Sequence, residues 1–238
     1  MTLGQLADRI SAAIWNLHPQ WAVAVGRHEY DGQVPDLSAG AVEAGLERLG
    51  RLRDQLDGLA DLTPEEQQER EVLRGVIDRE RGDGERVVRW RRDPGWYPGA
   101  LDISVYLERD YAPAGLRLER AAAILGEAGG LLFAARENLS REMPRAWVEH
   151  AVTQARRRAA EVVAQAEWAP EGRDAPAEAA WLREAAGFAA AELTAYAAWL
   201  EAERLLVASG DEALGREGLE EWLRAAEGLD WTAGDLAS

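Results

Sequence analysis

One histidine-containing segment begins like the zinc-binding helix of a metalloprotease. His28 and Glu29 match the first two positions of the HExxH pattern, in which a second histidine four residues later binds the same metal ion. Position 32 is Gly, and Tyr30, Asp31 and Gly32 favour a turn over a helix. Because the metal needs two imidazoles one helical turn apart, we interpret His28 as a loop histidine and predict no metal site.

A second candidate pair, Glu149 and His150, lies inside a predicted helix. Such a pair could act as acid and base or as two metal ligands, but adjacent helical residues point about 100° apart and rarely share a ligand. Arg145 lies four residues before Glu149, a spacing typical of a surface ion pair. An exposed helical histidine is the alternative interpretation, and Glu149 and His150 stay candidate contacts for a substrate or partner.

Aromatic and charged side chains concentrate between residues 90 and 113, where Pro and Gly interrupt regular structure. Rings beside paired charges can line a cleft for a peptide or a sugar. They can equally fix a long irregular segment against neighbouring helices. If the segment forms the wall of a site, its candidate contacts are Trp96, Tyr97, Arg109, Asp110 and Tyr111. No catalytic residue is assigned.

The composition excludes several kinds of site. All 27 basic residues are arginine and there is no cysteine, which excludes Schiff-base and P-loop lysines, disulfides, thiolate metal sites and a cysteine nucleophile. The three histidines, at positions 18, 28 and 150, lie far apart in the sequence. We therefore predict no metal and no cofactor in this chain. The net charge of -16 disfavours nucleic acid as a partner.

The sequence shows no sign of a targeting or membrane segment. The first residues lack the basic and apolar regions of a signal peptide, and the most apolar run, residues 189–200, contains Glu192. We therefore expect a cytoplasmic protein with no membrane partner.

Apolar residues recur at three- and four-residue spacings along most of the chain, which predicts helices joined by short loops. Thr2 and Ser38 are placed as helix caps, and Thr63 with Glu66 forms a capping box. The longer helices are expected at residues 2–17, 38–59, 64–81, 114–139, 144–168 and 177–208. The prediction is a single all-α domain over residues 1–238, an antiparallel array of about seven to nine helices with one irregular aromatic-rich segment. A hinge is expected near residues 169–177.

Five short motifs follow one another in an order that resembles a known family. In chain order they are Gly26 with Tyr30-Asp31 and Leu37-Ser38; Arg92-Asp93-Pro94 with Trp96-Tyr97; the run RDYAP at 109–113; RENL at 136–139 with Pro144; and Glu149 with Ala151. This order resembles the N-terminal half of DUF885, a bacterial family of uncharacterised, largely helical proteins. Residues 215–229 and Asp235-Leu236 are similar to it as well.

The resemblance implies a zinc-dependent, peptidase-like site in the longer family members. Their second half carries an HExxxHH-like motif, beside a deep cleft between two lobes. This chain has no such motif, so no metal ligand or catalytic residue is carried over to it. The family often has His two residues before the helix Glu, where this chain has Trp147, and its own His150 follows Glu149.

These observations predict the helical N-terminal lobe of a DUF885-type protein, present as a fragment or truncated product. It would form one wall of a substrate cleft and be catalytically inert alone. Its partner would be the missing C-terminal lobe or a second copy, and its ligand a peptide. The alternative is a free-standing helical binding protein that uses the segment from Trp90 to Tyr111. A complete enzyme would need a pair of carboxylates, as in glycosidases, and the 43 acidic residues do not single out a pair.

Overall fold

A computed structural model describes residues 1–169, 174–209 and 215–236, and this part of the chain is all-α, as predicted. It contains no strand, and its one isolated bridge joins Pro144 to Ser209. Eight of the described helices have seven residues or more, within the predicted range of seven to nine. They are α1 (Leu3–Leu17), α3 (Ala39–Asp57), α4 (Pro64–Arg81), α7 (Ala114–Gly126), α8 (Ala128–Asn138), α9 (Arg145–Trp168), α10 (Pro176–Trp199) and α11 (Gly215–Glu227).

Shorter elements fill the segments between these helices. The aromatic-rich segment, expected to be irregular, consists of short pieces of helix separated by turns. Four short α-helices are α2 (Pro19–Ala24), α5 (Arg89–Arg92), α6 (Ser104–Glu108) and α12 (Ala233–Leu236). Two 3-10 helices span His28–Tyr30 and Tyr97–Leu101, and two π-helical turns span Gly82–Val87 and Leu200–Arg204.

Two of the predicted helix caps are confirmed by hydrogen bonds in the first helical turn. The Thr63 side chain accepts a hydrogen bond from the Glu66 N–H at 3.2 Å, and the Glu66 carboxylate accepts one from the Thr63 N–H at 2.9 Å. Thr2 and Gln5 exchange the same pair of bonds at the start of α1. Each exchange satisfies backbone donors that the first helical turn leaves unpaired, and thereby fixes where the helix begins.

Several expected helix boundaries were wrong. The helix expected over 177–208 ends at Trp199 and continues into the π-helical turn Leu200–Arg204. Tertiary packing explains two further differences. The helix expected over 114–139 breaks at Glu127, so that α7 and α8 each pack against α10. The helix that was expected to fray at residues 82–84 continues into a π-helical turn. There Gly84 lies against Leu46, where a Cβ atom would come within 2.6 Å of the leucine side chain. Val88, in the left-handed conformation with φ of 50°, ends this turn.

The described residues form two compact units, each built around its own helices. Unit 1 comprises residues 1–17, 39–89 and 215–236, with α1, α3, α4, α11 and α12. Its core is the apolar stripe of α1 packed against α3 and α4. The buried members of this core are Leu3, Leu6, Ile10, Ala13, Ile14, Leu49, Leu52, Leu56 and Ile77. Burial of each leucine or isoleucine stabilises the fold by about 1.5–3 kcal/mol before entropy is subtracted.

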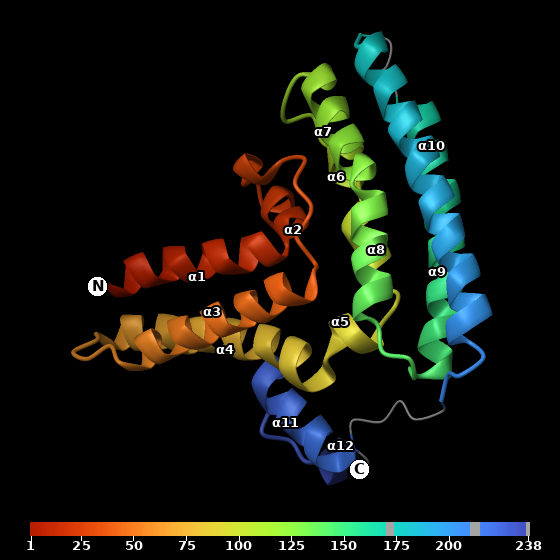
Figure 1. The fold of residues 1–238 in the computed structure, drawn as a ribbon. Helices are drawn as coiled ribbons and strands as arrows, with labels where there is room; N and C mark the ends of the chain where they lie inside the picture. Colours follow the sequence, from red (N-terminus) through yellow and green to blue (C-terminus); the bar gives the residue numbers. More distant parts are fainter. Residues whose placement is uncertain (170–173, 210–214, 237–238) are drawn as a thin grey trace. The chain divides into compact units, whose positions relative to one another are not determined.

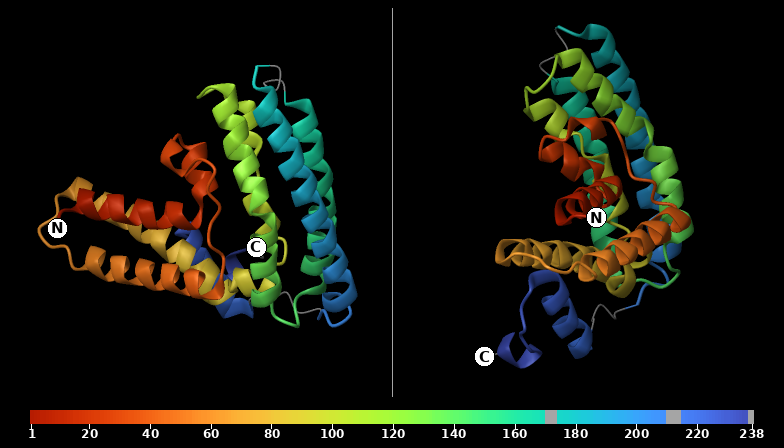
Figure 2. Two further views of the ribbon diagram at one scale, coloured as in Figure 1. Left: turned by 45° about the horizontal axis from the view of Figure 1, so that its top comes forward. Right: turned by 90° about the vertical axis from the view of Figure 1, so that its left-hand side faces the viewer.

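Unit 2 comprises residues 18–38, 90–169 and 174–209, and α10 is its central helix. This helix packs against α7, α8 and α9, and it lies side by side with α9 in the views of Figures 1 and 2. Five of its eight buried residues are alanine, which lets the neighbouring helix backbones approach closely. The single domain remains a prediction, and residues 170–173 of the expected hinge lie outside the described residues.

Across the described residues, no helix combines the length and apolar character that crossing a membrane requires.

Candidate functional site

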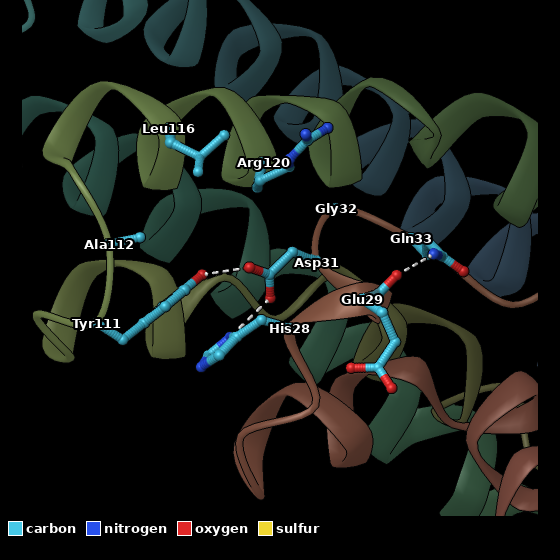
Figure 3. Close-up of a pocket in the computed structure, with 9 residues that line it drawn as sticks. All are labelled: His28, Glu29, Asp31, Gly32, Gln33, Tyr111, Ala112, Leu116 and Arg120. Carbon is cyan, nitrogen blue, oxygen red and sulfur yellow. Dashed lines mark hydrogen bonds and ion pairs between the residues drawn. The ribbon is translucent and has the colours of Figure 1, made fainter.

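A pocket of about 610 Å³ opens in unit 2 between the 3-10 turn at His28 and the start of α7 (Figure 3). Segments about 80 residues apart in the chain form its walls. One is the turn from His28 to Gln33, and the other runs from Tyr111 into the first two turns of α7. Its lining residues are His28, Glu29, Asp31, Gly32, Gln33, Tyr111, Ala112, Leu116 and Arg120.

Glycine shapes the turn that carries His28. Gly26 and Gly32 have φ angles of +90° and +75°, which glycine adopts with little strain. Gly32 also packs closely on α7, since a Cβ atom there would lie 2.9 Å from Cδ of Arg120. Its N–H donates a hydrogen bond to the Tyr106 hydroxyl at 3.0 Å. The turn is therefore held against α6 and α7 by backbone contacts.

Three side chains form a connected cluster at the pocket wall: Asp31, His28 and Tyr111. One oxygen of the Asp31 carboxylate lies 3.3 Å from Nδ1 of His28, and the other accepts a hydrogen bond from the Tyr111 hydroxyl at 3.1 Å. The His28 and Tyr111 rings stack face to face, 3.9 Å apart and 8° from parallel. Figure 3 shows dashed lines from the Asp31 carboxylate to both residues. Asp31 thus uses both carboxylate oxygens to hold two aromatic rings.

Two tyrosines beside the turn keep their hydroxyl protons. Burial, with a smaller contribution from the nearby Asp31 carboxylate, raises the pKa of Tyr106 to about 12. Burial is also the largest cause that raises the pKa of Tyr111, followed by the charge of Asp31 and its hydrogen bond. Both phenols therefore stay neutral over the physiological pH range, and the Tyr111 hydroxyl serves as a donor to Asp31.

The segment that brings Tyr111 to the pocket is fixed by two arginines. The side chain of Arg117 is buried, and it donates hydrogen bonds to the backbone carbonyls of Tyr106 at 2.8 Å and Ala112 at 2.9 Å. Arg109 donates to the Ala24 carbonyl at 2.6 Å and so ties the same segment to α2. These bonds bridge the irregular stretch between α6 and α7, and they set the position of the tyrosine.

The residues predicted from the sequence lie in three places. Tyr111 lines the pocket, with Arg109 and Asp110 directly before it; the Asp110 side chain is 94% exposed and ion-paired with Arg117 at 3.4 Å. Glu149 and His150 are exposed on α9, where Glu149 pairs with Arg145 at 3.6 Å, as expected from the spacing.

Trp96 and Tyr97 lie away from the pocket, with their rings in edge contact at 5.2 Å. Tyr97 is fully buried; its hydroxyl donates to the Trp90 carbonyl at 2.5 Å and accepts from the Asn138 amide at 3.0 Å. These contacts match the packing interpretation of the aromatic segment at this point. The role of the seven residues as ligand contacts stays a prediction.

His28 and Asp31 were not predicted from the sequence as parts of one site. The HExxH pattern, which requires a helix, does not describe a histidine in a turn. The available signal was the spacing of three residues between His28 and Asp31, with glycines at 26 and 32 that permit a tight turn. Tyr111 could not be paired with them, because the contact joins residues 80 positions apart.

A second pocket, of about 360 Å³, lies in unit 1 between the end of α4, the following π-helical turn and α11. Its charged side chains are largely paired with one another: Arg81 with Glu85 at 2.9 Å, and Arg86 with Glu221. We therefore interpret these side chains as packing contacts between α4, the π-helical turn and α11. Among the described residues, no group of three or more His, Asp or Glu side chains is arranged to hold a metal ion.

A protein-family model matches most of this chain. The model of "Bacterial protein of unknown function (DUF885)" matches residues 19–237. The chain belongs to the DUF885 family. This confirms the resemblance drawn from the five motifs, and the matched range includes both segments of the pocket.

One solved structure shares the fold of this DUF885 chain. It is described as "a putative lipoprotein of unknown function from Shewanella oneidensis" and has a TM-score of 0.70 at 21% sequence identity. The match covers 85% of this chain and 37% of that one. This chain therefore spans well under half the length of the solved relative. No curated protein matches the chain.

Proposed function

We propose that this chain is the ligand-binding helical lobe of a DUF885 protein and that it binds peptides in the pocket beside His28. In this proposal a zinc-dependent, peptidase-like activity belongs to longer family members, and the lobe forms one wall of the substrate cleft. The observation that carries it is the pocket itself, in which an ordered His28–Asp31–Tyr111 cluster faces an apolar side chain, Leu116.

The lining suits one segment of a peptide. Leu116 is 40% exposed and offers an apolar surface, while Gln33 and Arg120 supply donors for peptide carbonyls or a carboxylate. Glu29 bears a negative charge that could meet an amino terminus, and a hydrogen bond from Arg27 is the largest cause that lowers its pKa. The pocket thus combines an apolar contact with polar groups of both signs, as peptide sites do.

The alternative of a free-standing binding protein places the ligand along the whole segment from Trp90 to Tyr111. In the structure Trp90 and Tyr97 are buried, and the pocket lies at the Tyr111 end of that segment. The geometry therefore favours binding centred on the pocket.

A titration followed by NMR tests the proposal. The chain has three histidines, so the imidazole signals of His28 can be assigned and followed while an alanine pentapeptide with free termini is added. We expect saturable shifts of the His28 signals and unchanged His150 signals. Unchanged His28 signals at millimolar peptide would refute the proposal.

A matched pair of variants distinguishes damage to the pocket from the general effect of adding a charge to the surface. Leu116 on α7 and Val163 on α9 are each 40% exposed, but only Leu116 lines the pocket. Leu116→Asp should abolish the peptide-induced shifts, while Val163→Asp should leave them unchanged. A calorimetric titration with zinc completes the test: the proposal expects no tight stoichiometric site in this chain.

A further inference from the structure

We propose that the pocket is a proton-transfer site, in which Nε2 of His28 accepts a proton from the bound ligand and Asp31 is the positioning residue that holds the ring hydrogen on Nδ1, so that the lone pair of the neutral ring lies on Nε2. The ligand would carry an ammonium or hydroxyl group, or would hold a water molecule against the ring. The inference rests on the proposed function only for the identity of the ligand as a peptide.

The position of Asp31 determines which ring nitrogen carries the proton. A carboxylate accepts hydrogen bonds but donates none, so the contact of 3.3 Å between Asp31 and Nδ1 requires a hydrogen atom on Nδ1. In the neutral ring the lone pair then resides on Nε2. The carboxylate is 10% exposed, and because little water competes for its oxygens, this preference is strong.

Tyr111 completes the positioning. Its hydroxyl occupies the second oxygen of Asp31, which leaves the carboxylate one orientation toward the imidazole. Its ring covers one face of His28 at 3.9 Å and limits rotation of the imidazole. Asp31 thus sets the tautomer of His28, and the stacked ring of Tyr111 limits the rotation of the imidazole plane.

The other ring nitrogen is open to the pocket. The His28 side chain is 41% exposed and lines the cavity, and no hydrogen bond within the described part of the chain engages Nε2. Glu29 and Arg120, which also line the pocket, have exposed ion-pair partners, Arg27 at 2.7 Å and Glu119 at 3.8 Å, and both stay accessible to a ligand. A ligand group is therefore the natural partner of Nε2.

The proposed step moves a single proton. The ligand O–H or N–H bond breaks, its proton joins the lone pair of Nε2, and the bonding electron pair remains on the ligand oxygen or nitrogen. The ring becomes an imidazolium whose Nδ1–H still donates to the Asp31 carboxylate, so the new positive charge lies beside a negative one. The reverse transfer restores the neutral ring.

The other two histidines differ from His28 and serve as internal references. His150 is exposed on α9, and His18 stacks on Trp21 at 3.9 Å. The hydrogen bond to Asp31 requires the Nδ1–H tautomer whether its role is structural or functional. Proton acceptance requires, in addition, a lone pair on Nε2 that a molecule in the pocket can reach.

The test measures the tautomer of each histidine by nitrogen NMR at pH 9, above the ordinary histidine pKa of about 6.5. We expect His28 to be protonated at Nδ1. In Asp31→Asn the amide N–H₂ can turn toward the ring, and the ratio of the Nδ1–H to the Nε2–H form should fall by about tenfold or more. Tyr111→Phe retains the stacked ring and the carboxylate, so its ratio should stay close to that of the wild type.

The nucleophilicity of Nε2 gives a second readout. Diethyl pyrocarbonate acylates unprotonated imidazole nitrogens, and we expect its rate at His28 to fall several-fold in Asp31→Asn while the rate at His150 is unchanged. If wild-type His28 is protonated at Nε2, or if the variant keeps both ratio and rate, the inference is overturned. The tautomer of His28 in the wild-type protein tests the inference even if the Asp31→Asn variant does not fold. Failed peptide binding with the expected tautomer would refute the proposed function alone.

Discussion

Replacing Arg117 by methionine should destabilise unit 2 and displace Tyr111 from the pocket. The arginine is 3% exposed and donates to the backbone carbonyls of Tyr106 and Ala112 at 2.8 and 2.9 Å. Methionine fills a similar volume but donates nothing, so both carbonyls lose a charged donor where little water can replace it.

The expected magnitude follows from these two bonds. A hydrogen bond from a charged donor contributes about 1.5–3 kcal/mol, so two give about 3–6 kcal/mol. Added apolar burial of the methionine side chain returns about 1–2 kcal/mol. We therefore expect Arg117→Met to lower the free energy of unfolding by about 3 kcal/mol. The free energy of unfolding of Arg117→Lys should lie between those of the wild type and Arg117→Met, because one ammonium replaces the planar fork that reaches both carbonyls.

Urea denaturation followed by circular dichroism measures the loss, and the nitrogen spectrum of His28 reports on the pocket. Asp110→Asn is the matched control: its carboxylate faces Arg117 at 3.4 Å but is 94% exposed, so it should change stability by less than about 0.5 kcal/mol. A loss below about 1 kcal/mol for Arg117→Met, or an equal loss for Asp110→Asn, would refute the assignment of the stabilisation to the buried carbonyls.

Three further predictions concern other parts of the chain. Gly32→Ala should cost roughly 1 kcal/mol more than Gly26→Ala, because both have positive φ but only Gly32 packs against Arg120; equal losses in denaturant would show that the close approach is unimportant. Thr63→Ala should lower stability by about 1 kcal/mol through loss of the capping box, with Thr153→Ala, on the surface of α9, as the control expected to stay within about 0.5 kcal/mol. Burial raises the pKa of both Tyr97 and Tyr106 to about 12, so the folded state holds these protons more tightly than the unfolded chain does. Their contribution to stability is complete below pH 10 and is lost as the pH rises toward 12, by about 1.4 kcal/mol per pH unit for each tyrosine; Tyr97→Phe should reduce that slope, and an unchanged slope would contradict this account.

Signals that act over a few residues were predicted well. The Thr63–Glu66 capping box, the Thr2 cap and the Leu3–Leu6–Ile10–Ile14 stripe depend only on helical spacing, and each was found as expected. Pro144 before α9 also placed a helix start within one residue. In each case the pattern lies within one helix, so spacing in the sequence fixes which residues share a turn or a face.

Boundaries set by packing were predicted less well. Gly126, Gly129 and Gly130 did not show from the sequence where α7 ends, because the break at Glu127 serves the contacts of α7 and α8 with α10. Likewise, Gly82 and Gly84 suggested an end to α4, whereas close packing of Gly84 on Leu46 maintains a π-helical turn. Glycine signals low helix propensity, but whether the helix ends depends on what lies beside it.

The sequence by itself determined that the protein is all-α and a member of DUF885, and that cysteine and lysine chemistry are excluded. It also marked Tyr111 as a candidate contact. Only the tertiary structure decided that Tyr111 meets His28 and Asp31, while Tyr97 turns into the core. The reason is physical: a helix forms from hydrogen bonds between residues four apart, which the local sequence encodes. The pocket forms only when the turn at His28 docks on α7, through the close approach of Gly32 to Arg120 and the bond from Gly32 to Tyr106. Arg117 holds the segment that carries Tyr111 to the other wall.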